Sequence, residues 1–260
     1  MKAKKGLKTI VAIIIGLMIS GVAIYLSETF NNESENKVDD EFVCPEIIKP
    51  KLETVSDFGE VYYYLEGRSG LILCFHGTGG GASGWSNDGT DKNDFLMDFA
   101  AEGWSFVCPS SYNRKEKKWD NTNNQKNNDI QNIDDLLKHF GKSFPSIILV
   151  GHSNGGGFAT RYAAFSKFSN SIKAIQLSNA PGITPYLGNN DFKFPILFNY
   201  ADCDPVVPAD DVKSNQSILD SKYPPTNYID NNLDTEYSVG EYEHCHEFVN
   251  TSTKVLELLD

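Results

Sequence analysis

The chain is poor in basic residues. It has 23 lysines and arginines against 35 aspartates and glutamates, a formal net charge of −12. Four of the lysines lie in the first 30 residues, which hold one glutamate, so the remainder has 19 basic and 34 acidic residues. Such a surface repels polyanions, so the composition argues against nucleic-acid binding and against an anionic polymer as substrate.

Cysteine is also scarce, and the five cysteines cannot all pair with one another. Cys74 and Cys108 fall in apolar runs and are expected to be buried thiols. Cys203 and Cys245 lie in two polar loops, where a disulfide or two free thiols are both compatible with the sequence. The residues around Cys245 include His244 and His246, but no further ligands follow at zinc-site spacing, so we expect no metal.

The N-terminus does not have the character of a folded domain. Residues 1–8 are basic, and residues 9–27 are uncharged and apolar. As a helix, residues 9–27 would span about 28 Å, close to the hydrocarbon thickness of a bilayer. The flanking lysines predict a cytoplasmic N-terminus and a membrane-anchored body outside the cytoplasm. A cleaved signal peptide, which would leave a secreted protein, is the alternative.

Residues 28–54 are expected to form a polar linker, and residues 55–260 a single domain without internal repeats. Apolar runs alternate with helical patterns in this domain, which predicts an α/β fold with a mostly parallel sheet and helices on both faces. A helix is expected over 94–102, with Asp94 as its N-cap, and others over 130–140 and near the C-terminus. The expected strands cover residues 61–65, 70–75, 104–108, 146–150, 172–177, 195–200 and 236–239.

One polar insertion interrupts this alternation at residues 110–128. It follows the end of an expected strand, and ligands bind at the carboxyl edge of α/β sheets. Trp119 is its candidate substrate contact, although most such segments are simply surface.

Residues 151–155, Gly-His-Ser-Asn-Gly, carry the strongest functional signal. They stand between a buried strand and a helix that begins with glycines. In this setting the motif Gly-x-Ser-x-Gly places a serine on a sharp turn, with its hydroxyl exposed above the sheet. Ser153 is therefore the candidate nucleophile.

A serine nucleophile needs a base and a group that orients the base, and here the chain order is serine, acid, histidine. Asp204 and Asp202 compete for the role of acid. We favour Asp204, because the Pro-Val-Val-Pro sequence that follows it would fix the turn. His246 and His244 compete for the role of base, and we favour His246, at the start of the closing helical pattern.

The oxyanion of an acyl-transfer intermediate needs backbone N–H donors. Asn154 directly follows the nucleophile, and Thr78 or Gly79 lies in the glycine-rich turn of residues 76–81. That turn lacks the Lys-Ser/Thr ending of a phosphate-binding loop, so no nucleotide cofactor is expected.

Residues 76–80, 151–156 and 204–208 together resemble the α/β-hydrolase superfamily, and within it secreted esterases of the polyhydroxybutyrate-depolymerase/feruloyl-esterase type. The resemblance implies an eight-stranded sheet, acyl-serine chemistry, an ester substrate and no metal or organic cofactor. The paired acids and paired histidines depart from the family pattern and leave those two roles open.

The sequence thus predicts a carboxylesterase for short-acyl or polymeric esters, since residues 178–194 are too few for a large helical lid. A serine peptidase or acyltransferase on the same fold, or a non-enzymatic binding domain, remains possible from these motifs. The oligomeric state is open.

Overall fold

The structure is a computed structural model. It describes residues 48–122, 126–188, 192, 194–222, 228–233, 245–257 and 259. The expected basic segment and anchor, residues 1–8 and 9–27, lie outside this part of the chain. Among the described residues, no helix is both long and apolar enough to cross a bilayer.

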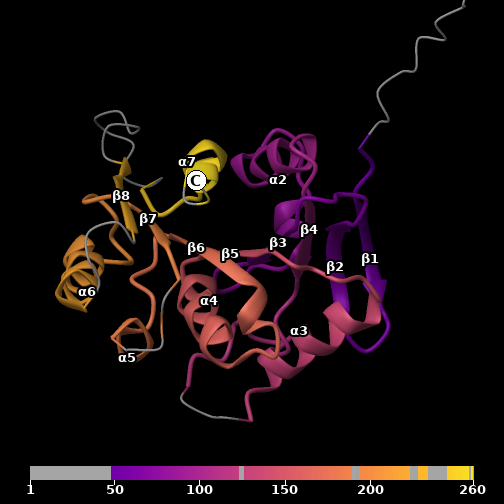
Figure 1. The fold of residues 1–260 in the computed structure, drawn as a ribbon, viewed down its shortest axis with the longest axis horizontal. Helices are drawn as coiled ribbons and strands as arrows, with labels where there is room; N and C mark the ends of the chain where they lie inside the picture. The colour runs from indigo at the N-terminus through magenta and orange to yellow at the C-terminus, as the bar shows by residue number, and fades with distance from the viewer. Residues whose placement is uncertain are drawn as a thin grey trace, which may run out of the picture. The chain divides into compact units, whose positions relative to one another are not determined.

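The core of the domain is one eight-stranded sheet with the strand order β1-β2-β4-β3-β5-β6-β7-β8 (Figure 1). Strand β2 runs antiparallel to both of its neighbours, β1 and β4, and all other pairs are parallel. The prediction of a mostly parallel sheet is confirmed. The strands are β1 (Lys51–Val55), β2 (Gly59–Tyr64), β3 (Leu71–Phe75), β4 (Ser105–Pro109), β5 (Ile147–His152), β6 (Ile172–Ser178), β7 (Ile196–Tyr200) and β8 (Tyr228–Asn232).

Helices cover both faces of the sheet. In Figure 1, α2 (Asp91–Ala101) and α7 (Ser252–Glu257) lie on one side. The opposite side carries α3 (Asn128–His139), α4 (Asn154–Phe165), α5 (Thr184–Leu187) and α6 (Ala209–Lys222). Two short 3-10 helices, η1 (Ala82–Trp85) and η2 (Ser169–Ser171), complete the described helical elements.

The central strands are buried on both faces because their side chains alternate between two cores. Leu71, Leu73 and Phe75 of β3 pack in the core beneath α3 and α4, whereas Ile72 and Cys74 pack in the core beneath α2 and α7. This alternation follows from the two-residue period of a strand. It also explains why the central strands are continuous apolar runs in the sequence.

The structure corrects the expected starts of the folded domain and of α2, and it adds an edge strand. The sheet begins at β1, so residues 51–54 belong to the folded domain and not to a linker. The described edge strand after α6 is β8 at residues 228–232, and the strand expected at 236–239 lies outside the described residues. Helix α2 begins earlier than expected, and its N-cap is Thr90, whose hydroxyl accepts a hydrogen bond from Asn93 N at 3.4 Å.

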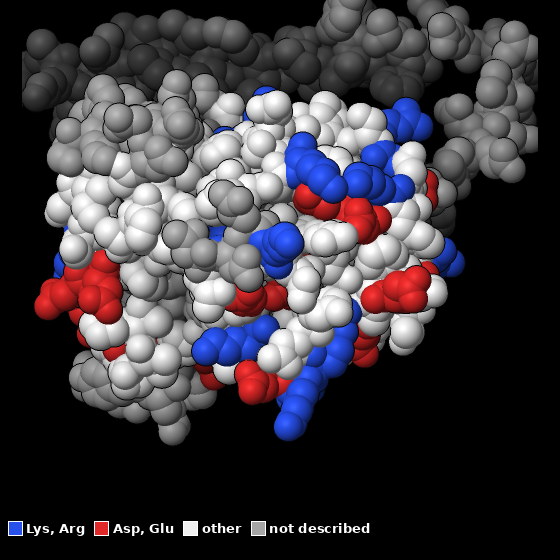
Figure 2. Space-filling model, turned by 90° about the horizontal axis from the view of Figure 1, so that it is seen from below, with Lys and Arg blue, Asp and Glu red and all other residues white. Residues whose placement is uncertain are grey.

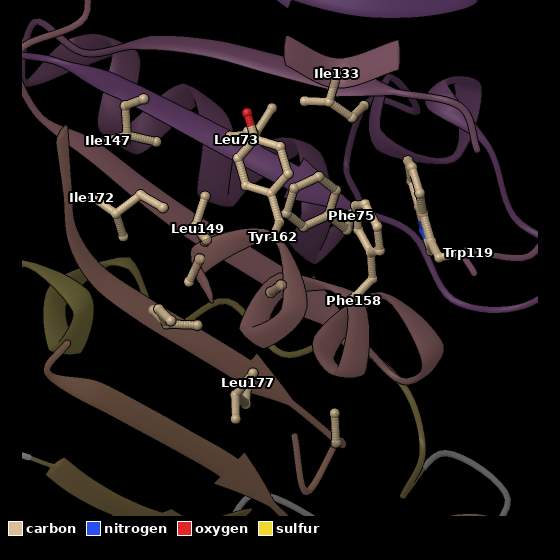
Figure 3. Close-up of a cluster of buried hydrophobic side chains, with 14 of the residues drawn as sticks. Leu73, Phe75, Trp119, Ile133, Ile147, Leu149, Phe158, Tyr162, Ile172 and Leu177 are labelled. Atoms are coloured by element: carbon tan, nitrogen blue, oxygen red, sulfur yellow. The ribbon is translucent and has the colours of Figure 1, made fainter. Parts of the chain in front are cut away.

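The interpretation of Trp119 as an exposed substrate contact is wrong. Its side chain is 1% exposed and stacks on Phe158 with ring centroids 4.7 Å apart (Figure 3). Its indole N–H donates to the carbonyl of His76 at 2.8 Å. Trp119 therefore anchors the insertion of residues 110–128 to the core, and the apolar area of a buried tryptophan explains why it does so.

The connection between β6 and β7 contains one described helix, the four-residue α5. This agrees with the absence of a large lid. The face shown in Figure 2 carries lysines and arginines close to aspartates and glutamates among the described residues.

Candidate active site

Ser153 occupies a strained turn between β5 and α4. Its backbone has φ 52° and ψ −121°, in a region that residues with a side chain rarely adopt. Two backbone hydrogen bonds stabilise the turn: Ser153 N donates to Ser178 O at 2.9 Å, and Gly156 N donates to Ser153 O at 2.9 Å. A serine in this conformation sits beyond the end of the strand, as the motif predicts.

The glycines beside Ser153 allow the start of α4 to approach the sheet. A Cβ on Gly155 would lie 2.3 Å from the carbonyl oxygen of Phe75, and one on Gly151 would lie 2.4 Å from the carbonyl oxygen of Gly155. Both contacts are with backbone, which cannot move aside. Glycine at these positions is thus required for the close approach of helix and strand.

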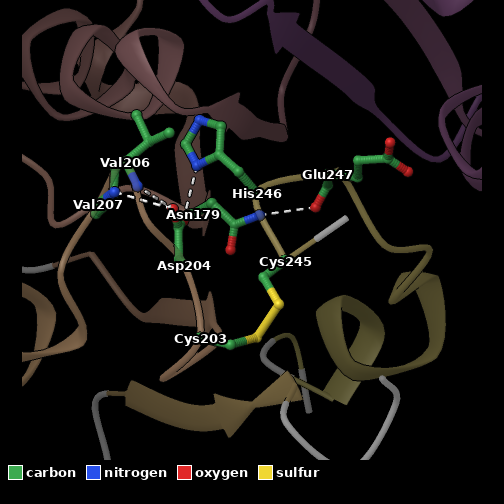
Figure 4. The surroundings of a disulfide bond; sticks show 8 residues. All are labelled: Asn179, Cys203, Asp204, Val206, Val207, Cys245, His246 and Glu247. Carbon is green, nitrogen blue, oxygen red and sulfur yellow. Dashed lines mark hydrogen bonds and ion pairs between the residues drawn. A yellow bond between two sulfur atoms is a disulfide. The ribbon is translucent and has the colours of Figure 1, made fainter. Parts of the chain in front are cut away.

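His246 and Asp204 form a hydrogen-bonded pair. His246 Nδ1 lies 2.7 Å from Asp204 Oδ2, and the side chain of Asp204 is 1% exposed (Figure 4). The other carboxylate oxygen accepts hydrogen bonds from Val206 N at 2.7 Å and Val207 N at 3.0 Å. A carboxylate cannot donate, so Nδ1 carries the proton and Nε2 of the neutral imidazole is left as the basic nitrogen.

The competing acid and base have other places. Asp202 lies on the surface, where it pairs with Lys213 Nζ at 2.7 Å and accepts from Asn232 Nδ2 at 3.2 Å. His244 lies outside the described residues. The structure thus brings Asp204, and not Asp202, to His246.

The segment that carries His246 is attached to three successive strand ends. Cys245 forms a disulfide with Cys203, just after β7 (Figure 4). His152, the last residue of β5, places Nε2 2.8 Å from the carbonyl oxygen of His246. Asn179, just after β6, donates from Nδ2 to the carbonyl oxygen of Glu247 at 2.7 Å. These bonds fix the backbone on both sides of the imidazole.

The glycine-rich turn after β3 lies against the nucleophile. A Cβ on Gly77 would be 3.3 Å from Ser153 Cβ, so this residue passes directly beside the serine. Gly79 N donates to Lys117 O at 2.9 Å, which excludes Gly79 as an oxyanion donor in this conformation. Thr78 remains as the donor expected from this turn. Asn154 is the first residue of α4, so its N–H has no acceptor within the helix.

The side chain of Asn154 has a separate role that the motif does not predict. Its Oδ1 accepts from Trp119 N at 2.8 Å, and its Nδ2 donates to Trp119 O at 3.4 Å. The side chain of Asn154, the residue after Ser153, thereby holds the insertion in place.

Comparisons with known proteins bear on the fold. No protein-family model and no curated protein sequence matches the chain. Among solved structures, the Pyrococcus furiosus esterase Pf2001 gives a TM-score of 0.55 at 15% identity, covering 81% of this chain and 91% of its own. A "predicted CIB-like hydrolase" from Thermoplasma acidophilum gives 0.53 at 14%, covering 81% and 95%. Zea mays acyl-protein thioesterase 2 gives 0.51 at 13%, covering 78% and 100%.

The chain has the α/β-hydrolase fold. At these identities the likeness concerns the fold and not the substrate. In this chain Ser153 directly follows the fifth strand of the sequence, and Asp204 follows the seventh.

Two histidines of this hydrolase fold are held neutral. His76 accepts from Ser111 N through Nε2 at 3.1 Å, and its Nδ1 lies 2.7 Å from Gly77 O. Burial lowers the pKa of His76 to about 4, and burial also lowers the pKa of His152 to about 4. A neutral His152 has one N–H, and the carbonyl of His246 requires it to be at Nε2.

Two adjoining cavities flank the site. The larger, about 630 Å³, is lined by His152, His246 and the start of α2. The smaller, about 130 Å³, is lined by His152 and the turn of residues 76–81. His152 thus borders both cavities, whereas His246 borders only the larger and the turn of residues 76–81 only the smaller. No cluster of metal-binding side chains occurs among the described residues.

Sequence reasoning missed His152, Asn179 and Lys92, which all lie at this site. His152 is the variable residue of Gly-x-Ser-x-Gly, so the motif gives it no role. Asn179 has φ 48°, and an asparagine directly after an apolar strand was the available signal for such a backbone. Lys92 lies at the start of α2, and nothing in its local sequence points to a cavity.

Proposed function

We propose that the protein is a serine hydrolase, and specifically a carboxylesterase for short-acyl or polymeric esters. The observation that carries the proposal is the Asp204–His246 hydrogen bond of 2.7 Å at the same end of the sheet as the strained turn of Ser153. A buried acid that orients a histidine has this chemical use when a nucleophile stands nearby.

The mechanism follows from the protonation states. His246 Nε2 accepts the proton of Ser153 as Oγ attacks the ester carbonyl carbon, and Asp204 stabilises the imidazolium. The N–H groups of Asn154 and Thr78 bind the oxyanion. His246 then donates the proton to the departing alkoxide, which leaves an acyl-serine. Water deprotonated by His246 attacks the acyl carbon of this intermediate, the bond to Ser153 Oγ breaks as His246 returns the proton to Oγ, and the carboxylic acid is released.

The test is covalent labelling by a fluorophosphonate, which requires an activated serine. We expect labelling of the wild-type protein and none of Ser153→Ala. Ser214→Ala, which removes an exposed serine of α6, is the matched control and should label normally. A folded wild-type protein that resists the reagent would contradict the proposal and would favour a non-enzymatic binding domain.

The substrate preference rests on the short connection that carries α5. A site without a large lid suits a short acyl chain or the exposed chain of a polymer better than a long lipid chain. We expect 4-nitrophenyl acetate and butyrate to be cleaved faster than the palmitate. Adding thioesters and peptide anilides to the panel separates the esterase from a thioesterase and a peptidase, and added alcohols reveal acyl transfer.

We further propose that the domain works outside the cytoplasm, anchored by residues 9–27. The Cys203–Cys245 disulfide supports this location, since such bonds persist in oxidising compartments. Protection of the domain from external protease in intact cells would contradict it. Recovery of the protein in the medium would favour cleavage of a signal peptide instead.

A further inference from the structure

Lys92 is the only lysine or arginine among the described residues that lines either cavity of the site, and it lines both. It is the second residue of α2, and its side chain is half-buried. Among the described residues, Gly84 and His152 are the other two that line both cavities. A single cation therefore stands between the turn of residues 76–81 and His246.

A second unused donor lies beside it. Trp85 is 0% exposed and lines the smaller cavity, and its indole N–H has no hydrogen-bond partner among the described residues. The Lys92 ammonium lies 5.8 Å from the centroid of the Trp85 ring, so the ring face stabilises the cation. A buried N–H without an acceptor is unfavourable, so Trp85 leaves the polar groups at this end of α2 incompletely paired.

The surroundings of Lys92 leave its charge only partly compensated. No ion pair or hydrogen bond joins its ammonium to another described side chain at this site. Burial lowers the pKa of Lys92, and the negative charge of Glu247, which lines the larger cavity, opposes that shift. Asp91 lines the same cavity, but its carboxylate accepts a hydrogen bond from Asn250 N at 3.2 Å. His76 and His152 are neutral, as described above.

We propose that Lys92 binds a carboxylate carried by the substrate, so that the preferred substrates are esters with one negative charge near the scissile bond. This inference rests on the proposed esterase function and names its substrate class. The positive N-terminal end of α2, where Lys92 is the second residue, favours the same charge.

The charge distribution disfavours a substrate with more than one negative charge. The acidic body of the protein repels a polyanion, and Glu247 and Asp91 at the rim of the larger cavity oppose a second negative charge. Because Lys92 reaches both cavities, the carboxylate could belong to the acyl part or to the alcohol part of the ester. Matched esters distinguish the two.

The experiment compares the kcat/KM of charged and neutral esters of equal length. For the acyl part, mono-4-nitrophenyl adipate is compared with 4-nitrophenyl hexanoate. For the alcohol part, 4-acetoxybenzoate is compared with 4-acetoxybenzamide. In at least one pair we expect the anionic ester to be preferred about tenfold or more, the usual scale of a hydrogen bond to a charged group.

Variants of Lys92 then assign the preference. Lys92→Met keeps the aliphatic stem but removes the charge, and the ratio of the two kcat/KM values should fall to about one. Lys92→Arg should retain the ratio. Lys92→Glu should invert it and favour 4-nitrophenyl 6-aminohexanoate. Lys115→Met, at an exposed position that lines neither cavity, is the control and should keep the wild-type ratio.

Each outcome decides the matter. A wild-type enzyme that cleaves neutral esters but prefers neither anionic ester overturns the inference and leaves the proposed function standing. So does a preference that survives in Lys92→Met, or in Lys92→Gln if the methionine variant does not fold. A protein that cleaves no ester and resists fluorophosphonate overturns both.

Discussion

The Gly-x-Ser-x-Gly motif gives His152 no role, but the imidazole of this residue contacts His246, the candidate base. Its N–H reaches the backbone carbonyl of His246 at 2.8 Å, and the two rings lie 5.3 Å apart. Because its pKa is held near 4, His152 stays neutral and keeps this single donor at neutral pH. We regard it as a positioning residue for the base.

We expect His152→Leu to lower kcat about tenfold, because the base loses its fixed orientation. KM should change less, since leucine takes much of the place of the imidazole in the lining of both cavities. His152→Gln, whose Nε2 can donate to the same carbonyl, should recover part of the loss. Hydrolysis of 4-nitrophenyl acetate measures both. Equal losses in the leucine and glutamine variants would show that only the volume of the ring matters.

The close packing around Gly155 leads to a prediction about the stability of the fold. An alanine Cβ there would meet the backbone carbonyl of Phe75 at 2.3 Å, so α4 must move away from the sheet. We expect Gly155→Ala to lower the free energy of unfolding by about 3 kcal/mol or more. Gly84→Ala, where no atom lies within 4 Å of the added carbon, should change it by less than about 0.5 kcal/mol. Urea unfolding followed by tryptophan fluorescence measures both, and similar midpoints would contradict this packing.

At the scale of elements, residues 245–248 form neither a helix nor a strand. The position of this segment is determined by its bonds to the ends of β5, β6 and β7. The disulfide to Cys203 ties it to the end of β7, next to Asp204. The distance between the acid and the base therefore depends on a covalent bond formed 42 residues apart in the sequence.

We expect the double variant Cys203→Ser/Cys245→Ser to lose up to about 4 kcal/mol of stability, the chain-entropy value for a loop of this length. Its activity should fall further than its stability at the assay temperature explains, because the Asp204–His246 contact loosens. Melting curves and ester hydrolysis measure the two effects. Treatment with a reductant should reproduce both in the wild-type protein and change nothing in the double variant. Identical melting temperatures would contradict the prediction.

The elements that the sequence predicts well are those buried on both faces. Strands β3, β5 and β7 are continuous apolar runs, and their positions match within a residue or two. The edge strands β1 and β8 lack this signal: β1 is exposed at four of its five residues, and β8 ends in Asp-Asn-Asn. Pairing with a neighbour defines an edge strand, and pairing is not visible in its own residues.

At the scale of the whole molecule, some residues of the candidate site can be predicted from the sequence and others cannot. The sequence suffices to propose Ser153 as the nucleophile, because the strand, the glycines and the start of the helix are close together in the chain. The choice of Asp204 over Asp202 depends on which carboxylate faces a histidine 42 residues later, and their loops meet only in the folded chain. Trp119 is a similar case. Its sequence neighbours are polar and suggest an exposed side chain, but in the folded chain it is buried in the core.

The stability of the whole molecule should depend on pH through its two neutral histidines. In the unfolded chain a histidine has a pKa near 6.5, whereas the pKa values of His76 and His152 are about 4 in the folded chain. Below pH 6.5 the unfolded state therefore binds protons that the folded state does not. The free energy of unfolding should fall between pH 7 and pH 5 by about 2 kcal/mol for buried His76, and by less for half-buried His152.

Asp129 acts in the opposite direction, since burial raises the pKa of its carboxyl group. Urea unfolding at pH 7, 6 and 5 measures the slope, and His76→Asn should flatten it because that side chain does not titrate. Histidine NMR signals give a second measurement, which does not depend on the variant. A His76 resonance that titrates near pH 6.5 in the folded protein would show that the ring is not held neutral by Ser111 N–H and burial.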